Sequence, residues 1–338
     1  METLLSLYDP APSPLLDKLL DTPPLQRLAE VGMNCGCEYT AFPLFARTLP
    51  YSRRDHSAGA ARIVWHFTAS SAQAAAALLH DAATPVFAHT VDFLHGDPLR
   101  QESTEADTAA VIAASPEVMA VLAQYGLDVT DVGDYHRYPV ADNDSPRLSA
   151  DRLEYTLGNL FHYGFEDLPR LTAFYRDLTV SAGEDGQPEL AFRTPAIAED
   201  FALAALRTGR VYVCDEDRFA MEALASLLRD ALDRRVLSPA DLMGTEPAVI
   251  AKLRADTVSG PAWGHFRRFH AIRTAVGEQP EKGWWVRVDA KRRWIDPLAV
   301  GRGRVSAWSP VFREALTSFL ALDFTRWLSG IETEERPG

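Results

Sequence analysis

The chain has 338 residues, of which 47% are hydrophobic and 24% charged, a composition typical of one large folded domain or two smaller ones. Its formal net charge of −13 disfavours broad binding to a phosphate backbone, so no extended nucleic-acid partner is expected. No apolar run approaches the roughly 20 residues that span a bilayer, and residues 1–20 lack the pattern of a secretion signal. With three cysteines in no disulfide-like arrangement, these features predict a cytoplasmic protein without a membrane partner.

The first three quarters of the chain are predicted to be helical. Leucines between residues 15 and 28, interrupted by Pro23-Pro24, indicate two short helices, the second preceded by Thr22 as a cap. Small apolar residues predict a buried helix at 57–67, and the alanine and leucine run at 69–80 is the strongest helix signal in the sequence. Further helices are expected at 87–94, at 103–114 with Ser103 as cap, at 116–125, at 149–161 with Ser149 as cap, and at 168–178, 195–207, 217–235 and 246–254, with a short one from Ser238.

The last part of the chain has a different pattern. A turn at residues 183–186 predicts a hairpin with 190–192, and alternating residues at 284–288 and 293–295 predict a small β-ribbon. A terminal helix is expected at 310–328, followed by a polar tail. The sequence therefore predicts a mainly α fold, with residues 1–260 as a helical core and residues 261–338 as a C-terminal subdomain with a short β-ribbon and a terminal helix.

Two good metal ligands stand together where the strongest predicted helix ends. The imidazole of His80 and the carboxylate of Asp81 cannot both face a packed core, because an unpaired buried carboxylate is costly. His56 begins one predicted helix and Asp151 begins another, so four ligands from three helices can converge on one ion. Imidazole with carboxylate suits Fe, Mn, Zn, Co or Ni, with Mg as a further candidate. By itself, however, a His-Asp dipeptide is more often a helix cap or an ion pair.

Several segments, taken in order, resemble one known family. They are residues 21–28 (Asp-Thr-Pro-Pro-Leu-Gln-Arg-Leu), 53–59 (Arg-Arg-Asp-His-Ser-Ala-Gly), 78–89 (Leu-Leu-His-Asp-Ala-Ala-Thr-Pro-Val-Phe-Ala-His), 151–155 (Asp-Arg-Leu-Glu-Tyr), 210–212 (Arg-Val-Tyr) and 291–298 (Lys-Arg-Arg-Trp-Ile-Asp-Pro-Leu). Through them the chain resembles the deoxynucleotide triphosphohydrolase, or dGTPase-like, branch of the HD-domain phosphohydrolase superfamily. The resemblance implies an HD-domain helical bundle with a small C-terminal β-containing appendage.

The resemblance also implies an activity and a site. A metal-activated water would attack the phosphorus of a nucleotide or another small phosphate ester. The resemblance also implies that the protein is a homo-oligomer. The implied roles are metal ligation by His56, His80, Asp81 and Asp151; phosphate contact, positioning or proton transfer by Arg53, His89, Asp92 and Glu105; and substrate binding by Asn34, Arg152 and Tyr155.

The chain departs from the family pattern at positions that serve the phosphate chain. Thr84 and Thr104 stand where the family has histidines, Gly158-Asn159 replaces Arg-Asp, and Cys214-Asp215 replaces His-Lys. Fewer cations indicate a smaller or less charged substrate, such as a monophosphate, a sugar phosphate or a phosphodiester. The alternatives are therefore a phosphomonoesterase or phosphodiesterase on a non-triphosphate substrate, or a catalytically weak metal- or nucleotide-binding regulatory protein.

Other chemistry-bearing residues are interpreted as structural. His66 and His162 fall among apolar residues of predicted helices, where a histidine usually pairs within the fold. The run Lys291-Arg292-Arg293 is interpreted as a solvated turn. The tryptophans near it are interpreted as the core of the predicted ribbon.

Overall fold

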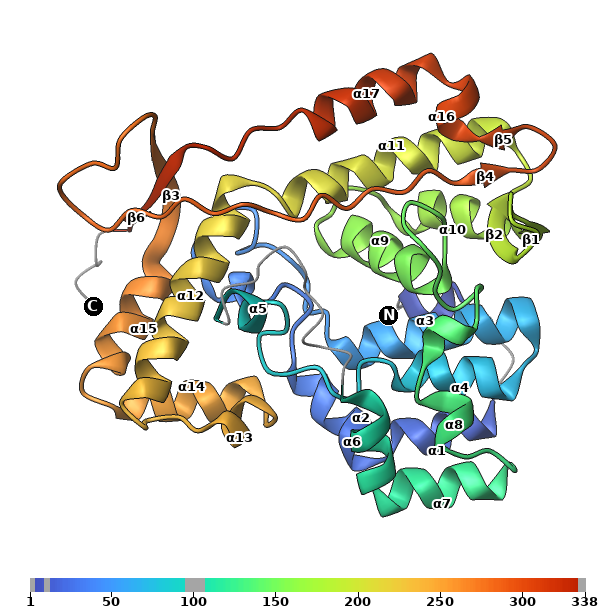
Figure 1. Cartoon of the computed structure of the whole chain (residues 1–338), viewed down its shortest axis with the longest axis horizontal. Coiled ribbons are helices and arrows are strands. Elements are labelled where there is room, and N and C mark those ends of the chain that lie inside the picture. Colours follow the sequence, from blue (N-terminus) through green and yellow to red (C-terminus); the bar gives the residue numbers. More distant parts are fainter. Residues whose placement is uncertain (1–3, 9–12, 95–106, 334–338) are drawn as a thin grey trace.

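The computed structural model describes residues 4–8, 13–94 and 107–333. Helices dominate these residues, so the predicted mainly α fold is confirmed (Figure 1). In the first half they are α1 (Pro14–Leu20), α2 (Pro23–Arg27), α3 (Arg53–Thr68), α4 (Ser71–Leu79), α5 (Thr90–Leu94), α6 (Thr108–Ala114), α7 (Pro116–Gln124), α8 (Val129–Val132), α9 (Ala150–His162) and α10 (Leu168–Arg176). In the second half they are α11 (Pro195–Val211), α12 (Asp215–Asp233), α13 (Pro239–Leu242), α14 (Glu246–Ala255), α15 (Ser259–Arg268), α16 (Val305–Trp308) and α17 (Pro310–Leu320).

Two small sheets accompany the helices. One has the strand order β1-β2-β4-β5, with β2 and β4 parallel and the other neighbours antiparallel. Its strands are β1 (Leu178–Ala182), β2 (Pro188–Phe192), β4 (Leu298–Ala299) and β5 (Gly303–Arg304). The other sheet is an antiparallel ribbon of β3 (Phe269–Ala275) and β6 (Trp327–Glu332). The predicted hairpin is thus present as β1 and β2, and the predicted C-terminal β part is present as well.

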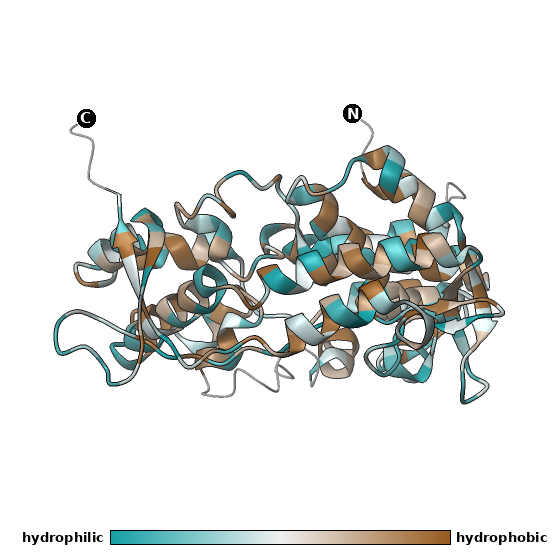
Figure 2. Ribbon diagram, turned by 90° about the horizontal axis from the view of Figure 1, so that it is seen from above, coloured by the Kyte–Doolittle hydropathy of each residue, from teal (hydrophilic) through white to brown (hydrophobic). Residues whose placement is uncertain are grey.

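The apolar interior falls into two clusters of buried residues. The first is built on α1, α3, α4, α9 and α11, and the second on α12, α14 and α15. In Figure 1 these groups lie on opposite sides of the view, and α11 packs on the first, with only its last residue, Val211, in the second cluster. Figure 2 shows that most helices carry both polar and apolar stretches, as expected for helices that bury one face. Residues on both sides of position 260 contribute to each cluster, and the domain boundary there stays a prediction.

The chain passes from the first cluster to the second directly after His80 and Asp81. Leu78 and Leu79 belong to the first cluster, whereas Val86 and Phe87 belong to the second. The segment between them is held by the Arg27 guanidinium, which donates to the carbonyl oxygens of residues 82 and 84 and to that of residue 244. The residues around positions 80 and 81 therefore stand at the junction of the two clusters.

The C-terminal elements differ from the prediction in position. Residues 284–295 form no ladder among the described residues; their single bridge joins Val286 to Leu328, and Trp284 is 44% exposed. Burial alternates there, with Val288 and Ala290 buried and residues 289 and 291 exposed, so an extended segment lying on helices gives the same sequence pattern as a strand. The predicted β-ribbon at 284–295 is therefore wrong, and β3 pairs with β6 instead.

Two helix predictions also need correction near that end. The terminal helix stops at Leu320 rather than residue 328, and Asp323 accepts from the backbone N–H of Thr325 in a turn just beyond it. Helix α15 was not expected, because it contains two glycines and a proline. Tertiary packing of Trp263 and Phe266 into the second cluster outweighs that poor propensity.

Local sequence explains why α3 begins where it does. The Ser52 hydroxyl accepts from the backbone N–H of Asp55, while the Asp55 carboxylate accepts from the backbone N–H of Ser52. This capping box fixes the first turn of α3, which carries Arg53 and His56. Ser149 caps α9 in a similar way, as predicted, and fixes the turn that carries Asp151.

Replacing Ser52 by alanine is expected to lower the free energy of unfolding by about 1 kcal/mol, because the N–H of Asp55 loses its acceptor. Ser52→Thr keeps a hydroxyl at the cap and should lose less. Urea unfolding checks this: the midpoint urea concentration should fall, while the slope of the free energy of unfolding against urea concentration stays unchanged. Equal losses in the two variants would contradict a role for the capping bond.

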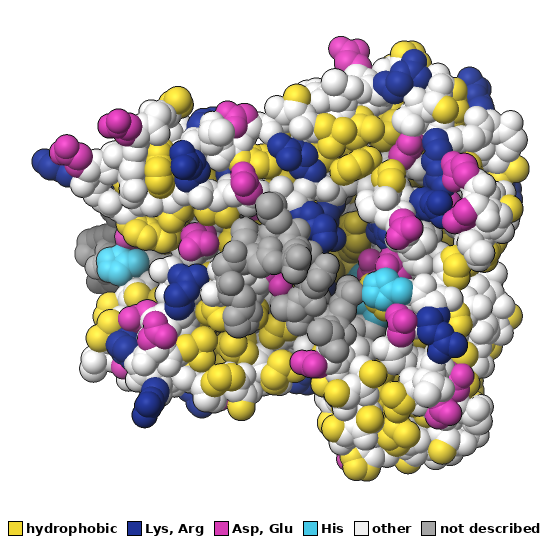
Figure 3. Space-filling model, viewed as in Figure 1, with side chains coloured by type: hydrophobic (Ala, Val, Ile, Leu, Met, Phe, Trp, Pro, Cys, Tyr) yellow, Lys and Arg dark blue, Asp and Glu magenta, His cyan; other side chains and the backbone are white. Residues whose placement is uncertain are grey.

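The structure also bears on membrane association. None of the helices in the described residues is both long enough and apolar enough to cross a bilayer. On the face shown in Figure 3, basic and acidic side chains are interspersed.

Candidate metal centre

Three of the four predicted metal ligands converge. The ligand atoms of His56, His80 and Asp151 all lie within 4.8 Å of one another. Asp151 Oδ1 is 3.0 Å from His56 Nε2 and 3.5 Å from His80 Nε2. Both histidines are buried, and Asp151 is partly exposed. Two imidazoles and a carboxylate at this spacing can ligate a single ion.

Asp81 lies at the edge of the same group. Its Oδ2 is 3.6 Å from His80 Nε2 and 4.0 Å from His56 Nε2. The carboxylate also accepts from Arg53 Nη1 at 3.2 Å and from Thr84 Oγ1 at 2.6 Å. Asp81 therefore lies beside the cluster, and a guanidinium and a hydroxyl fix its orientation.

Hydrogen bonds set the orientation of both histidines. His80 Nδ1 lies 2.8 Å from the carbonyl oxygen of Ala77. Because a carbonyl oxygen only accepts, a proton belongs on Nδ1, and Nε2 is the ring nitrogen that faces the cluster. His56 Nδ1 lies 2.6 Å from Glu154 Oε2, which orients its Nε2 in the same way. Such outer partners accompany most metal-bound histidines.

The electrostatics of the cluster favour a cation. Burial alone would lower the pKa of His56, but the hydrogen bonds that its ring donates to the carboxylates of Asp151 and Glu154 outweigh it and raise the pKa to about 10. Burial opposes ionisation of Asp81 and Asp151, yet the neighbouring cationic groups outweigh it and lower both pKa values. Protons on the imidazoles thus compensate the negative charge of the buried carboxylates. A bound divalent cation can replace those protons and compensate the same charge. The residues present therefore fit a metal ion.

Glu154 is a buried partner of the predicted ligand His56 that sequence reasoning missed. Its side chain is 1% exposed and accepts hydrogen bonds from the hydroxyls of Tyr51 and Tyr8, besides its bond to His56. Asp151 and Glu154 are three residues apart on α9 and share a face, which is the signal that could have identified it. A side chain at Gly59 would place its Cβ 2.5 Å from the Glu154 carboxylate, so glycine is needed there.

Gly158, one of the departures from the family pattern, has a local explanation. A Cβ at this position would lie 2.2 Å from the Tyr51 hydroxyl oxygen. The glycine on α9 therefore makes room for Tyr51 beside Glu154. Its neighbour Asn159 donates to the hydroxyl of Tyr212 at 2.7 Å.

The predicted catalytic residues are placed as follows. Arg53 is buried and bonded to Asp81. His89 Nδ1 lies 3.1 Å from Asp92 Oδ2, and burial together with the charges of Arg293 and Arg53 lowers the pKa of His89. Glu105 and the Thr104 departure lie outside the described residues. The roles of these residues stay predictions.

The predicted substrate residues are engaged within the fold. Asn34 Oδ1 accepts from the Tyr163 hydroxyl at 2.7 Å. Arg152 is buried, and its Nη1 donates to Asp142 Oδ1 at 2.5 Å and to Ser149 Oγ at 3.1 Å. The ring of Tyr155 is 6.3 Å from that of Tyr212. These contacts leave the predicted substrate roles untested.

The run Lys291-Arg292-Arg293 is not a simple solvated turn. The Arg292 guanidinium lies 4.5 Å from the centre of the Phe324 ring and donates to the carbonyl oxygen of Leu322. The positive charge of Arg293 works to lower the pKa values of both His89 and Tyr155, so this residue lies near the predicted site. Contacts between residues so distant in sequence carry no local signal.

The chain is similar in sequence to one known phosphohydrolase and in fold to another. No family model matches the chain. The chain is 26% identical over 166 residues to the metal-dependent phosphohydrolase cns2 of Cordyceps militaris, covering 48% of this chain and 46% of that protein. Its fold matches the crystal structure of the phosphohydrolase BT4208 of Bacteroides thetaiotaomicron, with a TM-score of 0.66 and 15% identity over 96% of this chain and 99% of the other. Both of these proteins are described as phosphohydrolases.

A third relative extends over more of the sequence. The chain is 25% identical over 244 residues to the uncharacterised protein YdhJ of Bacillus subtilis, covering 71% of each. By contrast, the match to the fungal phosphohydrolase spans less than half of that protein. The structural match, at 15% identity, shows a shared fold, which in this chain is mainly α with a small C-terminal β part.

Proposed function

We propose that this chain is a phosphohydrolase in which His56, His80, Asp81 and Asp151 hold a divalent transition metal that serves hydrolysis of a small phosphate ester. The observation that carries the proposal is the convergence of His56, His80 and Asp151 within 4.8 Å, with Asp81 beside them. The phosphohydrolase names of the fungal relative and of the structural match support it. Iron, manganese, zinc, cobalt and nickel all suit this donor set, and magnesium is a weaker fit.

Different residues of the chain would bind the phosphate and transfer the proton. When bound, the metal supplies a Lewis acid and lowers the pKa of water. Arg53, at the first position of α3 and 3.2 Å from Asp81, would neutralise a phosphate placed beside the cluster. His89, oriented by Asp92, has a lowered pKa because it is buried, and is the candidate for proton transfer in the described part of the chain.

A nucleotide is the proposed substrate, and a monophosphate or phosphodiester suits the site better than a triphosphate. Arg53 and Arg293 are the cationic residues whose charges lower the pKa of His89. Cys214 and Asp215 stand where the family pattern has a histidine and a lysine, and Asp215 pairs with Arg218. A shorter phosphate group needs fewer cations than a triphosphate does.

One observation favours a second candidate function, a metal- or nucleotide-binding protein with little turnover. Thr84 is fully buried, and its hydroxyl donates to Asp81 at 2.6 Å. A threonine in this position orients a ligand but cannot exchange protons near neutral pH as a histidine does. The site would then retain metal while lacking one means of proton transfer.

A product-resolved hydrolysis screen tests the proposal. The full chain, reconstituted anaerobically with each of the five transition metals and Mg²⁺, is incubated with nucleoside tri- and monophosphates, sugar phosphates and cyclic phosphodiesters. We expect release of orthophosphate from a monophosphate, or ring opening of a phosphodiester, with no release of inorganic triphosphate. Triphosphate as the main product would instead place the chain with the dGTPase-like branch.

A variant that tests the role of Arg53 is Arg53→Gln, assayed with metal in excess because Arg53 also pairs with Asp81; it should lower turnover even when the site is loaded. One lost charged hydrogen bond to the phosphate corresponds to about a tenfold to hundredfold loss in kcat/KM. Metal-loaded protein that binds nucleotides but hydrolyses none of the panel would favour the regulatory alternative.

A further inference from the structure

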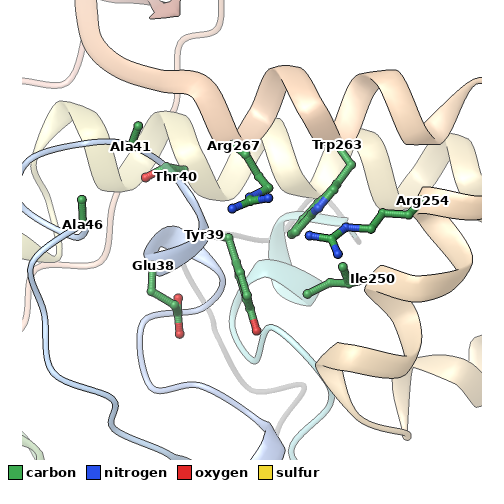
Figure 4. Close-up of a pocket in the computed structure, with 9 residues that line it drawn as sticks. All are labelled: Glu38, Tyr39, Thr40, Ala41, Ala46, Ile250, Arg254, Trp263 and Arg267. Carbon is green, nitrogen blue, oxygen red and sulfur yellow. The ribbon is translucent and has the colours of Figure 1, made fainter. Parts of the chain in front are cut away.

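A cavity separate from the metal cluster lies between α14, α15 and the segment at 38–46. Its volume is about 470 Å³, within the usual range for small-molecule sites. Figure 4 shows its lining residues, which come from these three parts of the chain; none of them belongs to the metal cluster. They are Glu38, Tyr39, Thr40, Ala41, Ala46, Ile250, Arg254, Trp263 and Arg267.

Two arginines give the cavity a positive side. Arg254 and Arg267 are both exposed, and in Figure 4 both guanidinium groups point towards Tyr39. In the described residues, neither guanidinium forms an ion pair with a carboxylate. In a chain with a net charge of −13, two such arginines on one cavity form a local site for an anion. A guanidinium fork matches the two oxygens of a carboxylate or a phosphate.

Aromatic groups form the apolar part of the cavity. The rings of Tyr39 and Trp263 are 5.5 Å apart, and Ile250 lies next to them in Figure 4. Trp263 is 2% exposed, and within the described part of the chain its Nε1–H has no acceptor. Leaving a buried donor without a partner is unfavourable for the fold.

Glu38 does not prevent an anion from binding. Burial and the neighbouring Glu246 raise the pKa of Glu38 to about 8, so its carboxyl group is mostly protonated at neutral pH. Its Oε2 has no hydrogen-bond partner among the described residues. The raised pKa weakens the negative charge of Glu38, and Arg254 and Arg267 are the cationic residues that line the cavity.

We propose that this cavity is a second binding site, for a small molecule that carries a carboxylate or phosphate group on a planar aromatic ring. The guanidinium groups of Arg254 and Arg267 bind the anionic group, and the ring packs against Tyr39 and Trp263. The site is independent of the proposed hydrolytic activity, since it shares no lining residue with the metal cluster.

Calorimetric titration of the metal-loaded full chain with two probes tests the proposal. Phenylphosphonate, which is not hydrolysed, represents the aromatic phosphates, and phenylacetate represents the aromatic carboxylates. We expect at least one of them to bind with a Kd of about 1 mM or below, an affinity reasonable for so small a ligand. Methylphosphonate, which lacks the ring, and benzyl alcohol, which lacks the charge, should bind far more weakly.

Matched arginine variants locate the binding. Arg254→Gln and Arg267→Gln should each weaken the better probe about tenfold, the effect of one lost charged hydrogen bond. Arg235→Gln, at an exposed arginine that does not line the cavity, should leave binding unchanged. Absence of binding by both probes, or equal affinities in the cavity variants and the wild type, would overturn the proposal.

Discussion

Replacing His80 by alanine is expected to abolish metal retention by the chain. The Nε2 atom of His80 is one of the three ligand atoms within 4.8 Å, and its Nδ1 is already bonded to the carbonyl oxygen of Ala77. Loss of an outer partner alone costs roughly 10–100-fold in metal affinity, so loss of a ligand should cost more. Elemental analysis after gel filtration measures the metal bound per chain.

Thermal stability provides an independent measurement of the same loss. A metal that binds only the folded chain stabilises it by about 2.7 kcal/mol at a concentration 100 times its Kd. The wild-type Tm should therefore rise on addition of metal, and the Tm of His80→Ala should not. Asp81→Ala is expected to behave in the same way, because Asp81 Oδ2 lies 3.6 Å from His80 Nε2.

His265→Ala is the matched control for these variants. His265 is exposed and pairs with Glu332, far from the cluster in sequence. This variant should keep the metal content and the metal-dependent rise in Tm of the wild type. Stoichiometric metal in His80→Ala would show that the cluster does not hold the ion.

The helical part of the fold and the metal cluster could both be predicted from the sequence. Serine caps marked the starts of α9 and α13, and proline marked that of α2, since these are local signals. The predicted capping bond of Thr22 is absent, because its hydroxyl donates to the carbonyl oxygen of Leu19. His80 was identified because an apolar run ended in ligand-type residues. Its convergence with His56 and Asp151 followed from the order of several motifs rather than from any single spacing.

The C-terminal part could not be predicted, for a physical reason. β3 pairs with β6, whose residues lie more than fifty positions later in the chain. The sequence of neither strand identifies the strand with which it pairs. Residues 284–295 have the alternation of a strand because one side of an extended segment packs on helices. Arg218 donates to the carbonyl oxygen of Val288 there, so a side chain replaces one hydrogen bond that a ladder would supply.

Outer partners of the ligands were only partly accessible from the sequence. Glu154 lies three residues after Asp151 on one helix, a spacing that places both on the same face. Its bonds to Tyr8 and Tyr51, in contrast, join residues 146 and 103 positions apart. Both tyrosines lie outside α3 and α9, so these contacts depend on how separate segments of the chain pack against α9, which no local pattern specifies.

Glu154→Gln is expected to weaken metal binding by about 10–100-fold while the chain stays folded. Glutamine keeps the shape of the buried side chain and can still accept a hydrogen bond from His56 Nδ1, now 2.6 Å from Glu154 Oε2. It removes the negative charge that increases the basicity of His56 as a ligand. Alanine is less informative, because it would leave three buried partners unsatisfied at once.

Metal titration followed by Tm or calorimetry measures this effect against a matched control. Tyr8→Phe removes the weaker hydroxyl bond to Glu154, at 3.3 Å, and keeps the carboxylate, so it should change the metal affinity much less. Gly59→Ala should act in the direction of Glu154→Gln, because its Cβ would lie 2.5 Å from the Glu154 carboxylate and displace it. Wild-type metal affinity in Glu154→Gln would mean that the backbone of α3 alone positions His56, and that the buried carboxylate has no part in tuning the ligand.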